Sequence, residues 1–167
     1  MMETIFNRRS IRRFTDEKVS KENLEKLLRA AMAAPSAKNG QPWEFIVVQD
    51  KEKIQAMSRL TPYARPLMQA PLGIVVCGNL EVNSYLEYCM IDCAAATENL
   101  LLEAHHLGLG GVWIGMYPMP ANFEKFNELF TVPSHIQPLW MVAIGHPSDE
   151  GKYIEQYNEE KIHYEDY

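Results

Sequence analysis

The sequence predicts one domain in which helices pack against a sheet (the α+β class), and three observations support this prediction. The chain has 167 residues, the usual length of a single domain. Hydrophobic residues make up 47% of it and charged residues 23%, a balance that supports a core and excludes intrinsic disorder. Segments with helical apolar spacing are separated by short, strongly apolar runs, so we expect both helices and strands.

Two longer segments have the spacing of helices. Ser20 is expected to cap a helix, because apolar residues then recur at i, i+3, i+4 and i+7 from Leu24. Pro35 is expected to end this helix. The longest helix is expected over residues 85–107 and to stop at Gly108. Apolar residues surround much of its cylinder, so we expect it to be a buried spine.

Two shorter helices and four strands complete the expected order. Asp50 can cap a short helix, and a helix with three phenylalanines is expected near residues 121–130. Residues 72–77 are continuously apolar, which is typical of a central strand covered on both faces. The other strands are expected at residues 43–48, 111–116 and 139–145.

Charge and composition exclude several classes of function. The net charge of −6 leaves no overall cationic surface for nucleic acid or acidic lipid. No apolar run approaches the ~20 residues of a membrane span, and the N-terminus lacks a signal peptide, so we expect a cytoplasmic protein. Three cysteines argue against a disulfide framework. Cys89 and Cys93 are interpreted as core thiols rather than as a metal or redox pair, and no metal site is expected.

A cluster of arginines is the feature of this acidic chain that could hold an anion. Arg8, Arg9, Arg12 and Arg13 lie within six residues and include the hydroxyl donor Ser10. Guanidinium groups suit bidentate recognition of a phosphate. In an extended segment, Arg8, Ser10 and Arg12 share one side. The alternative is a solvated surface of positive charge.

Two further segments suggest contact with a ligand. The loop at residues 35–43 carries Asn39 and Gln41, whose amides can read the edge of a flat heterocycle; the alternative is a turn with a bond from the Asn39 side chain. Residues 108–115 place glycines at a junction between helix and strand, where the backbone can approach a ligand closely. This is not a dinucleotide fingerprint, because it closes a helix instead of opening one.

The C-terminal segment is charged but carries several aromatic residues. Residues 152–167 include four tyrosines that a segment after the last core element cannot bury by itself. Either the segment lies along its own domain or it wraps around a neighbouring subunit, and we favour the neighbouring subunit.

Four motifs together resemble the nitroreductase family of flavin enzymes: residues 8–14 (RRSIRRF), 35–43 (PSAKNGQPW), 70–77 (APLGIVVC) and 108–115 (GLGGVWIG). The resemblance implies a three-layer α+β sandwich with a central mixed sheet flanked by helices. It also implies an intertwined homodimer with FMN at the subunit interface. Residues 1–167 would form a single FMN-binding domain, with the tail at residues 150–167 exchanged with the partner.

The resemblance also implies which residues bind the cofactor. The arginine-serine-arginine run would hold the FMN phosphate, the loop at residues 35–43 would contact the flavin, in part from the partner chain, and the glycines would lie by the isoalloxazine near N5. Many family members carry a basic pair just after the last strand, where this chain has only Lys152. Larger members carry a lysine before the second strand, where the cation of this chain is Arg65. The cofactor-binding residues expected in this way are Arg8, Arg9, Ser10, Arg12, Pro35, Ser36, Asn39, Gln41, Arg65, Gly110, Gly111 and Lys152.

The activity implied is an oxidoreductase in which NADH or NADPH reduces FMN and an electron-poor acceptor then takes its place. A nitroaromatic, a quinone or an activated alkene would serve as this small-molecule acceptor. The family needs no protein nucleophile or dedicated acid, so no catalytic residue is expected. The alternatives are a non-catalytic flavin-binding or redox-sensing protein, and a specialised member that removes halide or fragments the flavin.

Overall fold

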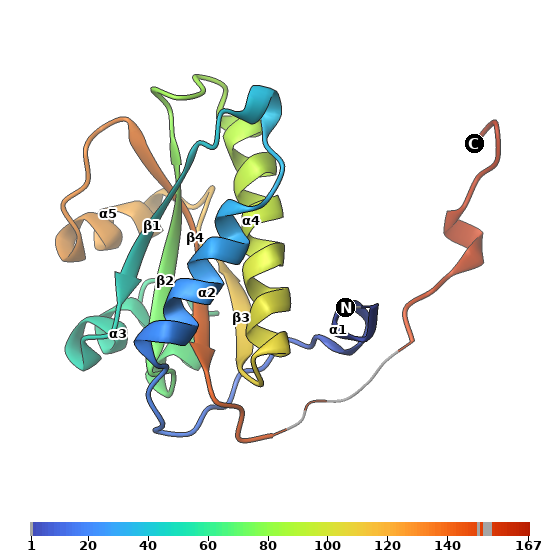
Figure 1. Cartoon of the computed structure of the whole chain (residues 1–167). Helices are drawn as coiled ribbons and strands as arrows, with labels where there is room; N and C mark the ends of the chain where they lie inside the picture. Colours follow the sequence, from blue (N-terminus) through green and yellow to red (C-terminus); the bar gives the residue numbers. More distant parts are fainter. Residues whose placement is uncertain (1, 150, 152–154) are drawn as a thin grey trace.

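The computed structural model describes residues 2–149, 151 and 155–167, and its centre is a four-stranded sheet (Figure 1). The strands lie in the order β1-β2-β4-β3, and every neighbouring pair is antiparallel. Their bounds are β1 Trp43–Val48, β2 Leu72–Asn79, β3 Gly110–Gly115 and β4 Ile136–Gly145.

The sheet of one chain differs in one respect from the mixed sheet that the resemblance implies. Its four strands are antiparallel throughout. Among the described residues, the parallel pairing is confined to an isolated bridge between Ser10 and Gly111. The physical reason is that the two central strands, β2 and β4, run in opposite directions, and β1 and β3 each add to one of them as an antiparallel edge.

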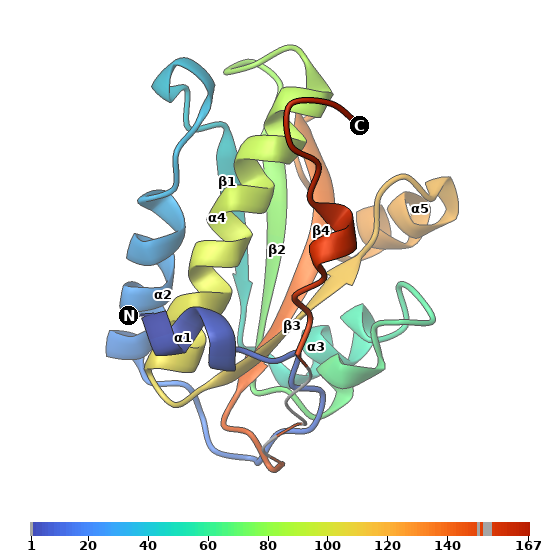
Figure 2. The ribbon, with the colours of Figure 1, turned by 90° about the vertical axis from the view of Figure 1, so that its right-hand side faces the viewer.

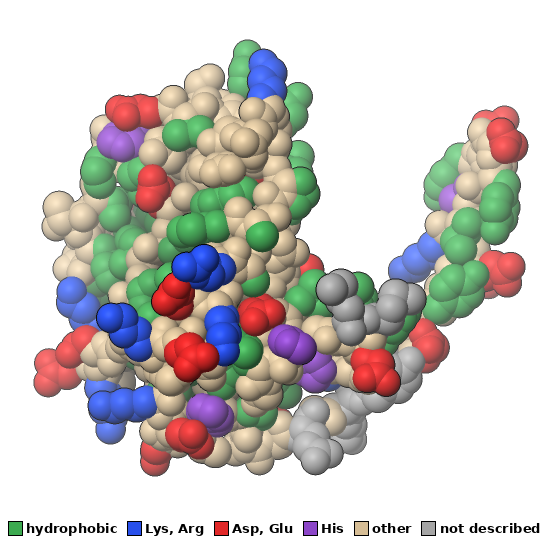
Figure 3. All heavy atoms as spheres, in the orientation of Figure 1, with side chains coloured by type: hydrophobic (Ala, Val, Ile, Leu, Met, Phe, Trp, Pro, Cys, Tyr) green, Lys and Arg blue, Asp and Glu red, His purple; other side chains and the backbone are tan. Residues whose placement is uncertain are grey.

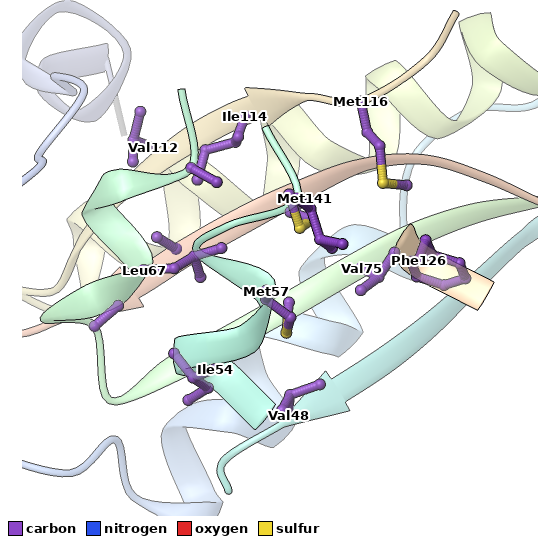
Figure 4. Packing of buried hydrophobic residues seen from close by; sticks show 14 of the residues in the cluster. Val48, Ile54, Met57, Leu67, Val75, Val112, Ile114, Met116, Phe126 and Met141 are labelled. Carbon is purple, nitrogen blue, oxygen red and sulfur yellow. The ribbon is translucent and has the colours of Figure 1, made fainter. Parts of the chain in front are cut away.

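Helices cover both faces of the sheet, so the α+β class and the three layers are confirmed. One face packs against two long helices and the other against two shorter ones (Figures 1 and 2). Val76 of β2 belongs to the core beneath the long helices. Its neighbour Val75 points into the opposite core (Figure 4). The helices are α1 Met2–Asn7, α2 Lys21–Met32, α3 Lys51–Met57, α4 Leu86–His106 and α5 Pro120–Leu129.

Local signals placed most element ends correctly. The Ser20 hydroxyl accepts a hydrogen bond from the backbone N–H of Asn23 at 3.1 Å, and Asp50 Oδ1 accepts one from Lys53 at 2.8 Å. Gly108 follows α4 with a φ of +73°, a left-handed conformation that glycine adopts without strain. Helix α1 was not expected. Its apolar residues are exposed in the single chain, so no buried stripe marks it.

Helix α4 is a spine with one buried face and one open face. Eight of its residues, from Cys89 to Ala104, are buried against the sheet and α2. Tyr88 and Ile91 are exposed on the opposite side, at 51% and 64% of their surface. The expectation that α4 is buried therefore holds for the face that packs on the sheet, and an apolar strip remains open.

The three cysteines are free and buried, as expected of core thiols. Burial, with a smaller contribution from Glu44, raises the pKa of Cys77 to about 12. Among the described helices, none combines the length and apolar character needed to cross a bilayer.

Residues 155–167 extend away from the rest of the chain (Figures 1 and 3). They contain a short 3-10 helix, Glu159–Lys161, and otherwise irregular backbone. Tyr157 and Tyr164 are 71% and 78% exposed. The described part of the tail therefore does not lie along its own domain, which was the first of the two alternatives.

Candidate functional site

The arginine cluster is extended and is fixed along the edge strand β3. The backbone N–H of Ile11 donates to the Gly111 carbonyl at 3.0 Å, and the Ile11 side chain is buried. Ser10 and Arg12, on either side of Ile11, are exposed. Because side chains alternate along extended backbone, the buried Ile11 holds its neighbours outward. The predicted alternation of Arg8, Ser10 and Arg12 is consistent with this geometry.

Of the first two glycines of β3, Gly110 is needed for this docking and Gly111 for packing against α4. A Cβ atom on Gly110 would lie 2.6 Å from Cβ of Ile11, and one on Gly111 would lie 2.8 Å from Cδ2 of Leu101. The close approach expected at Gly110 is thus made by residues 8–14 of the chain itself, named here the arginine segment, and the close approach at Gly111 is made by α4. Their position beside an isoalloxazine remains a prediction. A Cβ on Gly115 would meet no heavy atom within 4 Å, so packing within the chain does not require glycine there.

A groove of about 1020 Å³ opens over the arginine segment. Helix α1 contributes Ile5 and Phe6, and the tail contributes Tyr157. A cavity of about 250 Å³ adjoins it between the segment, α4 and β3. Five polar residues of the arginine segment line the groove: Arg8, Arg9, Ser10, Arg12 and Arg13.

The guanidinium group of Arg8 is only partly satisfied. Arg8 Nε lies 3.2 Å from Glu98 Oε1 of α4 and is buried, yet no acceptor meets it with hydrogen-bonding geometry. Arg9 donates to the carbonyls of Phe6 and Arg8, both at 2.6 Å, and Arg12 donates to the Ser10 carbonyl at 3.2 Å. A buried donor without an acceptor costs about 1–3 kcal/mol, so the site fits an incoming anion.

The pKa of His105 indicates a positive potential near the C-terminal end of α4. It lines the 250 Å³ cavity together with Arg8, Arg9 and Asp149. Burial lowers the pKa of His105 below its usual range, and the charges of Arg9 and Arg8, with a contribution from His106, lower it further. A phosphate group, whose charge opposes theirs, would relieve this repulsion.

The loop at residues 36–41, named here the amide loop, is strained and internally hydrogen-bonded. Lys38, Asn39 and Gln41 have φ values of 54°, 55° and 53°, a left-handed conformation that costs about 1–2 kcal/mol for a residue other than glycine. The Ser36 hydroxyl accepts from Gln41 N at 3.0 Å. Asn39 Oδ1 accepts from the Gln41 side chain at 3.0 Å, so the two amides are linked to each other.

One chain does not bring the amide loop to the arginine segment. The loop hydrogen-bonds to Asp92 near the beginning of α4, whereas the cavity of the arginine segment includes His105 at its end (Figure 1). Thirteen residues of helix separate these two positions, a rise of about 20 Å. Arg8 itself reaches α4 at Glu98, six residues from Asp92 or a rise of about 9 Å, but no residue of the amide loop lines the groove or the cavity.

Two further expected residues lie outside this grouping. Arg65 begins a short 3-10 helix, Arg65–Met68, and lines neither the groove nor the cavity. Lys152 falls outside the described residues. Pro35 comes directly before the amide loop and is grouped with it. The structure thus divides the expected residues into an arginine group and an amide group.

Three titratable residues of the site were missed by sequence reasoning: Asp92, Glu98 and His105. All three lie on α4. Asp92 and Glu98 bond to residues 55 and 90 positions away, and His105 shares a cavity with Arg8, 97 positions away, so no local pattern reveals them. A usable signal exists for Asp92, because it is an acidic residue on the apolar face of a helix that was expected to be buried.

Comparison with known proteins agrees with this geometry. A sequence profile described as the Nitroreductase family matches residues 5–73 and 63–146. A protein of Archaeoglobus fulgidus, provisionally named an NADH dehydrogenase/NAD(P)H nitroreductase, is 42% identical over 168 residues, covering 98% of this chain and 97% of its own. The solved FMN-dependent nitroreductase of Clostridium difficile R20291 is 34% identical with a TM-score of 0.92, covering 100% of both chains. A protein of Desulfovibrio desulfuricans, solved in complex with FMN, is 30% identical with a TM-score of 0.86, covering 99% of this chain and 96% of its own. This chain belongs to the nitroreductase family.

Proposed function

We propose that this protein is an FMN-dependent oxidoreductase that uses NADH or NADPH to reduce an electron-poor acceptor. The observation that carries the proposal is the buried Nε of Arg8, which lacks a hydrogen-bond acceptor beside a groove lined by three more arginines. FMN ends in a phosphate monoester, the anion that this donor set suits. Relatives over the whole chain are named for FMN and NAD(P)H, which supports the same conclusion.

The chain's own residues bind and orient the cofactor. Arg8, Ser10 and Arg12 would hold the phosphate, with Arg9 adding positive charge behind them. When bound, FMN supplies the redox chemistry, accepting a hydride from the nicotinamide and passing reducing equivalents to the acceptor. The groove between the arginine segment and the tail would limit which acceptors can approach.

The complete site is proposed to need two chains. The amide loop and the arginine segment contact α4 at different residues, and the loop lines neither the groove nor the cavity of the segment, so the loop of one protomer would serve the arginines of its partner. The open strip of α4, with Tyr88 and Ile91, provides an apolar surface for such contact. We propose a homodimer with FMN at the interface and the tail at residues 150–167 exchanged between protomers.

Three buried, free thiols also suit a reducing compartment, and we propose the cytoplasm as the location. A nitroaromatic, a quinone or an activated alkene remains the proposed class of acceptor.

The proposed function is tested by the visible absorption spectrum of the purified protein, followed by anaerobic addition of NADH or NADPH. We expect flavin bands that bleach with the nicotinamide and return when a quinone or nitroaromatic is added. Flavin bands that persist with either nicotinamide would favour a non-catalytic flavin-binding protein. A colourless protein that FMN does not stabilise against heat would contradict the proposal.

A further inference from the structure

We propose that Asp92 is a positioning residue: through its hydrogen bond to Ala37, it holds the amide loop in the conformation that contacts the flavin. This inference rests on the proposed function, because the loop's contact with the flavin is part of that proposal. Asp92 does not line the groove or the cavity of the arginine segment. It would act through the loop and not on the reacting atoms.

The contact has ordinary hydrogen-bond length and is partly buried. Asp92 Oδ1 accepts a hydrogen bond from the backbone N–H of Ala37 at 3.0 Å. The residue is 5% exposed, and its second oxygen, Oδ2, is buried without a hydrogen-bond partner. Burying a carboxylate with one oxygen unsatisfied costs free energy that an alanine at this position would avoid. Packing alone therefore does not account for an aspartate here.

The loop needs an external restraint. Lys38, Asn39 and Gln41 all occupy the left-handed region, and such backbone persists only where its surroundings over-determine it. The bonds from Gln41 to Ser36 and to Asn39 lie within the loop and do not fix it to the domain. Asp92 ties the first residue of the strained turn to α4, so it sets the direction in which the turn begins.

This arrangement predicts a specific pattern of ligand binding. The Asn39 and Gln41 side chains are linked at 3.0 Å, so a shift of the loop moves both amides together. These amides would read the ring of the flavin, while the arginine segment holds the phosphate. Loss of the Asp92 bond should therefore lower the affinities for FMN and for riboflavin by the same factor, because riboflavin has the ring without the phosphate.

The test compares Asp92→Ala with Asn99→Ala in the full-length protein. Asn99 lies on the same helix and its side chain donates to the Ala30 carbonyl at 3.2 Å, so this control removes a helix-to-backbone bond that does not reach the loop. The first measurement is the rate of trypsin cleavage after Lys38, followed by mass spectrometry without added flavin. The second is the dissociation constant for FMN and for riboflavin, from quenching of flavin fluorescence.

We expect Asp92→Ala to speed cleavage after Lys38 by roughly fivefold or more, as local opening of the loop becomes easier. The affinities for FMN and riboflavin should both fall by roughly threefold to tenfold. Asn99→Ala should change neither measurement. Unchanged cleavage at Lys38, or faster cleavage with unchanged flavin affinity, would overturn the proposal.

A second variant keeps the proposal testable if Asp92→Ala does not fold. Ala37→Pro removes the donor N–H, and its ring Cδ takes the place of that hydrogen and pushes the Asp92 carboxylate away, so the variant breaks the same bond from the side of the loop. Ser36, with φ −144° and ψ 154°, already has the extended conformation that a residue before proline adopts. Equal losses of FMN and riboflavin affinity are expected, and wild-type affinities would overturn the proposal. If the wild-type protein binds neither ligand, the proposed function itself fails, and trypsin cleavage after Lys38 still shows separately whether Asp92 restrains the loop.

Discussion

Arg8 of the N-terminal segment and Glu98 of α4 form an ion pair in which Nε and Oε1 lie 3.2 Å apart. The Arg8 side chain is 27% exposed and that of Glu98 is 48% exposed, so water partly screens the pair. The cation best placed to hold a phosphate is therefore already opposed by a carboxylate of its own chain. Binding an anion at Arg8 means competing with Glu98.

Substitution of Glu98 by glutamine should strengthen phosphate binding. A partly exposed pair that water screens is worth about 1 kcal/mol, so the affinity for FMN should rise by about twofold to fivefold. Riboflavin affinity should not change, and added salt should shrink the difference. Glu87→Gln is a matched control, because it makes the same change of charge at the other end of α4. Weaker FMN binding in Glu98→Gln would show instead that Glu98 orients Arg8.

Removal of the Arg8 guanidinium should weaken the binding of FMN but not that of riboflavin. Arg8→Ala removes a charge-assisted hydrogen bond, so the affinity for FMN should fall roughly tenfold to a hundredfold. Riboflavin, which lacks the phosphate, should bind as it does to the wild type. The measurement is a titration of each ligand followed by flavin fluorescence. Unchanged FMN affinity would contradict the assignment of Arg8 to the phosphate.

His105 should make both stability and anion binding depend on pH. Its pKa is lowered in the folded protein, chiefly by burial and then by Arg9 and Arg8. The unfolded chain therefore binds this proton at a higher pH, and the contribution of His105 to stability falls as the pH drops from the unfolded pKa toward the folded one. Asp149 lines the same cavity, and a nearby carboxylate favours the charged form of a histidine, but the net shift of the His105 pKa is downward.

Proton NMR of the histidine ring measures this effect. The pKa of His105 should lie below that of an exposed histidine and should rise when inorganic phosphate is added, because the anion offsets the arginine charges. His105→Gln should remove the titrating signal, while His106→Gln, at the neighbouring exposed position, should leave it. A His105 pKa that phosphate does not move would place the anion elsewhere.

Local chemistry explains which parts of the fold could be predicted from the sequence. The caps at Ser20 and Asp50 act over three residues, and the left-handed stop at Gly108 acts on its own backbone. The continuous apolar run of β2 is a direct consequence of burial on both faces. These signals lie within the segments that they describe, and each was confirmed.

The remaining features depend on contacts between distant segments. The Asp92 bond to Ala37 spans 55 residues, and Glu98 meets Arg8 across 90 positions. Which strands pair antiparallel is decided by the chain's path and not by any single strand, so the mixed sheet could not be tested by sequence patterns. Helix α1 leaves Ile5 and Phe6 exposed at 56% and 62%, so these two residues give no buried stripe that would mark the helix in the sequence.

Gly110→Ala should displace the arginine segment. The added methyl would lie 2.6 Å from Cβ of Ile11, and relief of this clash requires a shift of backbone, at a cost of about 1–3 kcal/mol in unfolding free energy. FMN affinity should fall together with stability, because Arg8 and Ser10 move with Ile11. Gly115→Ala is the control: its methyl meets no heavy atom within 4 Å, so stability should stay within about 0.5 kcal/mol of the wild type. Both are measured by urea unfolding and FMN titration.

Deletion of residues 155–167 should convert a dimer into a monomer with a weakened cofactor site. Tyr157, Tyr164 and Tyr167 are 71%, 78% and 103% exposed, and the described tail stands off from its own domain, so these rings need a surface that the single chain does not give them (Figure 3). If the partner supplies it, the tail contributes apolar burial to the dimer, and its loss lowers the association constant. Analytical ultracentrifugation of the truncated protein measures this directly. Replacement of Glu165 and Asp166 by glutamine and asparagine is the control, because it changes the charge of the tail and keeps its aromatic rings. A truncated protein that sediments as the same oligomer, with FMN still bound, would show that the dimer forms through the open strip of α4 without the exchanged tail.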